Sequence, residues 1–354
     1  MVITRVADPA LLKRRGLRQS AFFQGVGVEL LVATDSGGKP VARCAAIDNP
    51  RWRNSPRELG VGFDTRKAAF IGYFAAAPGH LTEVRQMLRA AERWLKRRGV
   101  WRVIAPCNGN ALVGMGLLTA GFTESPMFPM PWNPRYYVDY FERSDYAPRY
   151  PIWTYEIDFS SPEYRRFKRV LSSPRCHVRP ISKPSDKRAW RADIDTLRTL
   201  FNRSFRGEWE LQEFTQAEFQ EWADPLLPEN YVLFASIPNR RGPVGFAVGF
   251  PDWTPQFRAS RGAPPPRADL RRAANKPQRA GVIGGALLRS LKGQQFSPTV
   301  AAEFFRRMEE EYNLPGALYH FINHANAASR GLGAAAGGRG RILYHCYDKI
   351  IRPW

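Results

Sequence analysis

Hydrophobic and polar residues follow one another along the chain in blocks that predict strands and helices in a regular order. An apolar run over residues 68–74 precedes a polar loop, and residues 81–98 then carry apolar side chains three and four positions apart. These apolar positions are Val84, Met87, Leu88, Ala91 and Leu95. Such spacing places them along one stripe of a helix. With a short apolar run at 101–105, the pattern predicts strand, loop, amphipathic helix and strand.

The same order of elements occurs a second time. Residues 70–122 can be laid on residues 286–338 without a gap, and the apolar run at 282–291 then leads to a predicted helix over 298–313 and a strand over 317–322. In both copies an asparagine-containing turn and a helix of small residues are expected next. Self-similarity of this kind indicates that the chain contains one structural unit twice.

Each copy is preceded by two apolar runs joined by a turn, at residues 29–47 and 231–250, which predicts two β-hairpins. We therefore predict an N-terminal lobe over residues 1–158, a basic linker over 159–192 and a C-terminal lobe over 193–354. A Pro- and Arg-rich insert at 251–281 lacks an apolar pattern, so we expect a mobile basic loop there.

Charge changes the picture more than the rest of the composition does. The 354 residues include 53 Lys and Arg against 32 Asp and Glu, which gives a formal net charge of +21 and a pI of about 10.3. A field of this sign attracts a polyanion with an affinity that falls as salt rises. Solvated linkers are the alternative interpretation of the two basic segments.

The cellular setting is suggested by what the sequence lacks. No apolar run approaches the roughly 18 residues that cross a bilayer, and the start of the chain mixes charges with apolar residues. Four scattered cysteines without a C-x-x-C pair suit a reducing compartment. We expect a cytoplasmic protein without a membrane or metal partner, and the sequence is compatible with a monomer.

A resemblance sharpens these expectations. The order of elements, and the spacing Asn-x-x-Ala-x-x-Leu-Tyr-x-x-x-Gly-Phe that opens the last helix, resemble the GNAT acyltransferase fold. The spacing falls on Asn110, Val113, Gly116, Leu117, Gly121 and Phe122, and again on Asn326, Ser329, Leu332, Gly333, Gly337 and Gly338. The segments "APCNGN" and "FNRSFRGEWELQEFTQAEF" are similar to a group of two-lobed GNAT-like bacterial proteins. The resemblance implies an α+β, mixed α/β protein of tandem GNAT folds, each a twisted mixed sheet flanked by helices.

Two departures from the GNAT pattern concern coenzyme A. GNAT enzymes bind its pyrophosphate with a glycine-rich loop, because bare backbone N–H groups at a helix N-terminus must approach the phosphates. Here the two loops read "AAPGHLT" and "KGQQFSP". The tyrosine that protonates the leaving thiolate in many GNAT enzymes is replaced by Leu117 and Gly333.

We therefore expect a different donor. Fem-like and other GNAT-like transferases that use aminoacyl-tRNA need no pyrophosphate loop, and a tRNA partner suits the positive charge. The hypothesis is an aminoacyl-tRNA-dependent transferase that moves a small residue such as glycine to a small-molecule amine, as in antibiotic biosynthesis, without another cofactor. The alternatives are an N-acetyltransferase that uses acetyl-CoA and a non-catalytic RNA-binding GNAT-like protein.

Candidate site residues follow from the position of the acyl group in GNAT folds, where the fourth and fifth strands splay apart. We predict His320 or Asp252 as the base that deprotonates the amine, with Asn323 orienting the ester. A hydrogen-bonded strand histidine, a helix cap and core packing are the alternatives for His320, Asn326 and Tyr344 respectively. The predicted substrate-binding residues are Asn108, Asn326 and Tyr344. The predicted tRNA-binding residues are Arg165, Arg166, Lys168, Arg169, Arg258, Arg261, Arg267, Arg271, Arg272, Lys276, Arg279, Arg289 and Lys292.

Overall fold

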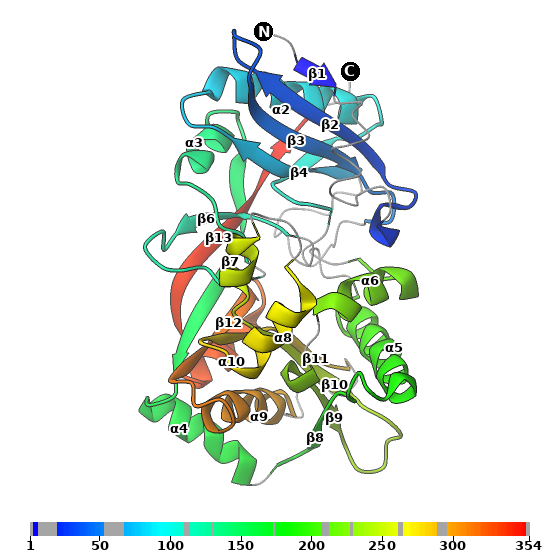
Figure 1. The fold of residues 1–354 in the computed structure, drawn as a ribbon, viewed down its shortest axis with the longest axis vertical. Coiled ribbons are helices and arrows are strands. Elements are labelled where there is room, and N and C mark those ends of the chain that lie inside the picture. Colours follow the sequence, from blue (N-terminus) through cyan, green and yellow to red (C-terminus); the bar gives the residue numbers. More distant parts are fainter. Residues whose placement is uncertain are drawn as a thin grey trace.

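The strands form a single continuous sheet across both predicted lobes. The computed structural model describes residues 3–5, 20–52, 67–109, 114–128, 130–172, 174–206, 212–226, 229–260, 265–288 and 296–351. Within these residues the strand order is β1-β2-β3-β4-β5-β13-β7-β12-β11-β10-β9-β8, and β6 pairs with β13 beside this path. Figure 1 shows lobe one in the upper half of the molecule and lobe two in the lower half, with β7 and β13 running between them.

Lobe one confirms the first predicted series of elements. Its elements are β1 (Ile3–Arg5), β2 (Gly27–Thr34), β3 (Pro40–Asp48), β4 (Ala68–Ala76), α2 (Leu81–Lys96) and β5 (Arg102–Ala105). Strands β1 to β4 are antiparallel, and β5 returns parallel to β4 because α2 crosses between them. The predicted stripe of α2 is buried against β2 and β3. Burial of each large apolar side chain stabilises this packing by about 1.5–3 kcal/mol.

Lobe two has the same connectivity. Its sheet contains β8 (His177–Pro180), β9 (Val232–Ser236), β10 (Gly245–Pro251), β11 (Ala280–Leu287) and β12 (Gly316–Asn323). The helix α9 (Phe296–Glu310) crosses between the parallel strands β11 and β12, as α2 does in lobe one. It packs on one face with α4 (Pro162–Lys168) and α10 (Ala327–Ala335), while α5 (Lys187–Ser204) and α6 (Gln216–Leu226) cover the other. Both copies of the repeat are therefore present in space.

The two lobes share their closing strands. β13 (Arg339–Ile350), from the end of the described chain, pairs with β5 of lobe one and with β7 (Ala147–Asp158). β7 in turn pairs with β12 of lobe two. Each lobe thus borrows a strand from the other half of the sequence. The division of the chain at residues 158 and 193 stays a prediction.

Two sequence expectations need correction. The insert 251–281 contains α7 (Thr254–Ala259) and α8 (Arg267–Asn275), whereas a loop was expected. Trp253, Leu270 and Ala274 of the insert are buried and anchor it to the lobe. In lobe one, the part of the predicted small-residue helix that the structure describes contains β6 (Leu117–Ala120) instead. Left-handed glycines bracket this strand, with φ of +86° at Gly116 and +82° at Gly121, and β13 supplies its partner.

Candidate functional site

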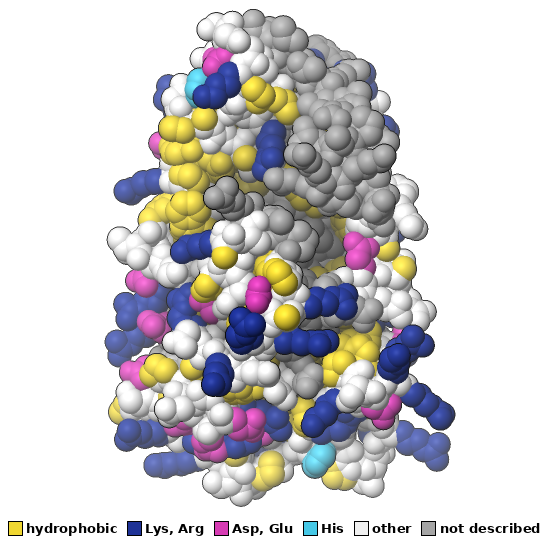
Figure 2. All heavy atoms as spheres, viewed as in Figure 1, with side chains coloured by type: hydrophobic (Ala, Val, Ile, Leu, Met, Phe, Trp, Pro, Cys, Tyr) yellow, Lys and Arg dark blue, Asp and Glu magenta, His cyan; other side chains and the backbone are white. Residues whose placement is uncertain are grey.

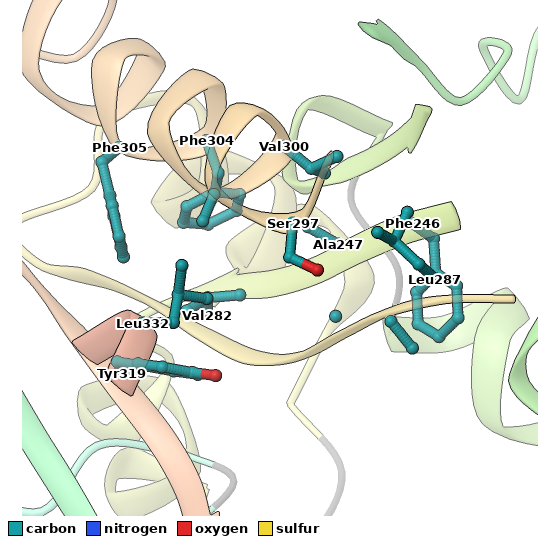
Figure 3. A pocket seen from close by; sticks show the side chains of 13 residues that line it. Phe246, Ala247, Val282, Leu287, Ser297, Val300, Phe304, Phe305, Tyr319 and Leu332 are labelled. Atoms are coloured by element: carbon teal, nitrogen blue, oxygen red, sulfur yellow. The ribbon is translucent and has the colours of Figure 1, made fainter. Parts of the chain in front are cut away.

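The apolar cavity at the C-terminal end of β11 is the strongest candidate for a binding site. It encloses about 450 Å³ outside the protein atoms, part of it open to solvent, and the side chains around it carry no charge. The lining residues are Phe246, Ala247, Val282, Gly285, Ala286, Leu287, Ser297, Val300, Ala301, Phe304, Phe305, Tyr319 and Leu332. Figure 3 shows α9 crossing above the cavity, with Tyr319 and Ser297 as the labelled side chains that carry oxygen. Such a lining favours an apolar ligand group.

The cavity exists because two strands diverge. β11 and β12 are paired only at Gly281 with Leu318 and at Val282 with Tyr319. The pairing of β11 with β10 shifts register after Val282, and that of β12 with β7 shifts after Tyr319. Bulges of this kind bend a strand away from its neighbour. The gap therefore opens at the place predicted for the acyl group, and α9 forms its roof.

Tyr319 brings a hydroxyl group to this gap. Its Oη lies 2.6 Å from Oγ of Ser329 on α10. Burial raises the pKa of Tyr319, and the hydrogen bond with Ser329 opposes this effect only in part. The phenol is therefore protonated at neutral pH and suits the role of a proton donor. The sequence analysis did not select Tyr319, although strand alternation places it on the opposite face of β12 from its neighbour His320.

His320 is buried away from the cavity lining. Only 1% of the residue is exposed, and its Nδ1 lies 2.9 Å from Oγ1 of Thr154 on β7. Its Nε2 has no partner within the described residues and faces Gly281 and Met127. The pKa of His320 is lowered to about 3, mainly by burial and in part by the positive charge of Arg279, while the negative charge of Asp252 opposes both effects.

The other two predicted catalytic residues have structural partners. The Asp252 carboxylate accepts hydrogen bonds from the Arg279 guanidinium, at 2.6 Å for the shorter one, and from the backbone of Thr254. Arg279 also donates to the carbonyl of Ser125 and so ties lobe one to lobe two. Asn323 Oδ1 accepts a hydrogen bond of 2.8 Å from the Ala325 backbone. Neither Asp252 nor Asn323 lines the cavity.

The predicted substrate-binding residues are not brought together. Asn326 caps α10 by accepting a 3.1 Å hydrogen bond from the backbone of Ser329. Tyr344 is fully buried in the core next to β6 and β7, and burial raises its pKa. Asn108 belongs to lobe one, where its Oδ1 accepts from the backbone N of Tyr73 at 2.6 Å. Only Asn326 is linked to the cavity, through Ser329.

The equivalent place in lobe one is filled by its own side chains. Cys107 and Asn108 hydrogen-bond to β4 and close the gap between β4 and β5. The helix α3 (Tyr136–Glu142) then occupies the loop before α2 with three tyrosines. Tyr137 accepts from the backbone N of Ala76, Tyr136 donates to its carbonyl, and Tyr140 both accepts from His80 N and donates to the Ala77 carbonyl. Two backbone N–H groups of this loop, those of Ala76 and His80, are thus bonded to tyrosine hydroxyls. The cavity lined by β10, β11, β12, α9 and α10 lies in lobe two.

The predicted tRNA-binding residues fall into three groups. Arg261, Arg289 and Lys292 lie outside the described residues. Lys168 is paired with Glu309 and Glu310, Arg272 with Asp269, and Arg279 with Asp252. The exposed ones are Arg165, Arg166, Arg169, Arg258, Arg267, Arg271 and Lys276. The exposed cations lie mainly on α4 and α8, which are separate in Figure 1.

Comparison with known proteins supports the fold. A tandem GNAT protein of the clavulanic acid pathway matches 99% of this chain and 97% of its own at a TM-score of 0.50 and 9% identity. A probable N-acyltransferase from Enterococcus faecalis matches 99% of this chain and 72% of its own at a TM-score of 0.54 and 9% identity. At these identities the likeness concerns the fold alone. The chain thus has a tandem GNAT fold, which confirms the predicted fold class.

Sequence relatives add a narrower observation. No protein family profile matches the chain. It is 28% identical over 230 residues to the bacterial ceramide synthase of Caulobacter vibrioides, across 62% of this chain and 56% of that protein. It is 27% identical over 170 residues to protein YghO of Escherichia coli, across 46% of this chain and 42% of that protein. The matches therefore span about half the length of these curated relatives.

Two further features were searched for. In the part of the chain that the structure describes, no three His, Cys, Asp or Glu side chains gather closely enough to hold a metal ion. None of the described helices combines the length and the apolar character needed to span a bilayer.

Proposed function

We propose that the protein is an N-acyltransferase that transfers a fatty acyl group from a thioester to a primary amine. The observation that carries this proposal is the uncharged, aromatic and aliphatic lining of the cavity at the divergence of β11 and β12. An aliphatic chain gains the transfer free energy of its methylenes in such a cavity, about 0.8 kcal/mol for each buried CH₂. A ceramide is the amide of a fatty acid and a long-chain amine, so the name of the Caulobacter relative agrees with this chemistry.

The reaction forms one bond and breaks one. The amine nitrogen attacks the thioester carbonyl, the C–N bond forms, the C–S bond breaks, and the thiolate leaves. The nitrogen loses one proton as the amide forms, and the thiolate gains one from a protein donor, which is then reprotonated by the proton from nitrogen through solvent. Tyr319 is the proposed donor of the proton that the thiolate gains, because its protonated hydroxyl lies where the strands diverge and is oriented by Ser329.

The aminoacyl-tRNA hypothesis remains the second candidate because the exposed arginines of α4 and α8 provide positive charge for a polyanion. It uses the same chemistry with an ester donor. The apolar cavity favours the fatty acyl group, since an aminoacyl group would bring an ammonium into a lining without a charged or carboxylate partner.

The experiment is a transfer assay with donors of graded chain length. Acyl thioesters of about two to about eighteen carbons, a series that adds one buried CH₂ at a time, are incubated with sphinganine, and the amide is identified by mass spectrometry. We expect kcat/KM to rise with chain length. Ala301→Phe, which narrows the cavity, should shift the optimum to shorter chains, whereas Ala90→Phe on α2 of lobe one is the matched control. Amide formation from aminoacyl-tRNA alone would overturn the proposal.

A further inference from the structure

Four elements come together at one end of the cavity. Leu287, the last residue of β11, lines the cavity. Its carbonyl accepts a 3.5 Å hydrogen bond from Ser204 Oγ, at the end of α5. The next backbone N, of Leu288, donates to the Val244 carbonyl at 2.9 Å, so the turn between β9 and β10 lies at the same end. Two residues of the lining are exposed, Gly285 on β11 and Ser297 in the first turn of α9.

Exposed arginines lie at the end of α5, in the β9–β10 turn and in the segment before β8. Arg203 lies in the last turn of α5, and Arg240 and Arg241 form the tip of the β9–β10 turn. Arg175 precedes Cys176, which contacts Thr299 in the first turn of α9. All four arginines are exposed. Figure 2 shows Lys and Arg side chains gathered over α5 and the strands β8 to β10 at the lower right, around an exposed apolar patch. We call Arg175, Arg203, Arg240 and Arg241 the arginine rim.

The arginine rim does not resemble a nucleotide pocket. A CoA thioester presents a diphosphate, which GNAT folds hold on bare backbone N–H groups at the helix N-terminus. Here the segment before α9 reads "KGQQFSP", with a single glycine. The alternative carrier of a fatty acyl thioester is a small acidic protein with a phosphopantetheine arm. Such a carrier presents the same thioester but is recognised through carboxylates over a wide surface.

We propose that the acyl donor is a fatty acyl thioester on an acidic carrier protein, which docks on the arginine rim and inserts its arm into the cavity. This inference rests on the proposed function and names the donor's carrier. The apolar cavity receives the acyl chain, while the rim attracts carboxylates of the carrier. Charge complementarity of this kind raises the association rate by about tenfold or more and weakens as salt is added. The formal charge of +21 disfavours a second copy of this chain as the occupant.

The test compares two donors that share one acyl chain. Palmitoyl carrier protein and palmitoyl-CoA are assayed with the same amine, using the full chain and the double variant Arg203→Glu, Arg241→Glu. The matched control is Arg89→Glu, Arg93→Glu, which makes the same charge change on exposed positions of α2 in lobe one. We expect the rim variant to lower kcat/KM for the carrier donor about tenfold, with less than twofold change for palmitoyl-CoA. The control should change neither, and the melting temperatures should agree.

Other outcomes separate the two proposals. If palmitoyl-CoA is used as well as the carrier donor, and the rim variant leaves both unchanged, the carrier inference is wrong while the N-acyltransferase proposal stands. A rim variant that slows both donors equally also overturns the carrier inference. If neither thioester yields an amide and only aminoacyl-tRNA does, both proposals fail.

Discussion

At the scale of single residues, the proposed mechanism depends on the hydroxyl of Tyr319 as proton donor. Removing it in Tyr319→Phe preserves the ring that lines the cavity and deletes the proton donor. General acid catalysis contributes about 10²–10⁴-fold, so we expect kcat to fall by about a hundredfold with KM little changed. Steady-state kinetics with an acyl thioester measure both. Tyr312→Phe, at a tyrosine outside the cavity lining, serves as control, and full activity of Tyr319→Phe would exclude the assigned role.

His320 gives a second prediction at this scale, on stability. The pKa of His320 is lowered from the ordinary 6.5 to about 3 in the folded protein, mainly by burial. Between these pH values the imidazole is therefore protonated in the unfolded chain and neutral in the folded protein. The stabilising contribution is complete above pH 6.5 and is lost as the pH falls toward 3. His320→Gln removes this titration. As the pH is lowered, we expect the free energy of unfolding of the wild type to fall more steeply than that of the variant, by a few kcal/mol in all. Urea titrations at several pH values measure both. Parallel curves would contradict the buried neutral state.

Residue-scale prediction from sequence succeeded in part. The strand that contains His320 was predictable because the apolar run and the repeat are local signals, whereas the gap beside it was expected from the resemblance to GNAT folds. The direction in which each side chain points was not predictable from sequence, since it depends on the bulge between Tyr319 and Ile322 and on Thr154 of a distant strand. His320 and Asn326 were selected by chemical type, whereas Tyr319 could be found only through the side of β12 that it occupies.

At the scale of elements, α3 is held against the loop before α2 by hydrogen bonds of three tyrosines. Tyr140→Phe leaves the backbone N of His80 and the carbonyl of Ala77 without this partner, whereas Tyr136→Phe affects only the carbonyl of Ala76. Removing one partner of a buried hydrogen bond costs about 1–3 kcal/mol, so we expect Tyr140→Phe to be the more destabilising. Neither should change kcat, because the open cavity is in lobe two. Urea unfolding and the transfer assay test this, and a large loss of kcat in Tyr140→Phe would place chemistry in lobe one.

Elements were predictable from sequence where their signal is local. The spacing of apolar residues in α2 and α9 predicts amphipathic helices, and both helices are present. β6 and α8 were missed because their formation depends on distant partners. β6 pairs with β13, and Asn133 holds both the N–H and the carbonyl of Leu118. α8 is mostly polar and is fixed by Leu270 and Ala274, too few positions for a recognisable period.

At the scale of the whole molecule, the exchange of β7 and β13 makes the lobes interdependent. Residues 1–158 alone lack β13, which pairs with β5 and brings the buried Tyr344 and Tyr347. They also leave β7 without its partners β12 and β13. We expect this fragment to lack a cooperative thermal transition and to gain one when it is co-expressed with residues 159–354. Cooperative unfolding of the isolated fragment would show that lobe one folds independently.

The tandem architecture was predictable because the sequence repeats itself, and repeats report a fold without reference to distant contacts. The sharing of β7 and β13 between the lobes was not predictable, since the local pattern of residues 147–158 and 339–350 does not indicate which lobe each strand pairs with. The same limit applies to the cavity. Its walls come from five elements that are brought together only by the folded chain.

The central claim, that lobe two holds the acyl chain in its apolar cavity, is tested most directly by photocrosslinking. A fatty acyl thioester with a diazirine near the chain end is bound, irradiated and mapped by mass spectrometry of peptides. The account predicts labels on β11 and on α9, at positions such as Val282, Val300 and Phe304. Labels concentrated on β4 and α2 of lobe one, or spread over the surface without saturation, would contradict it.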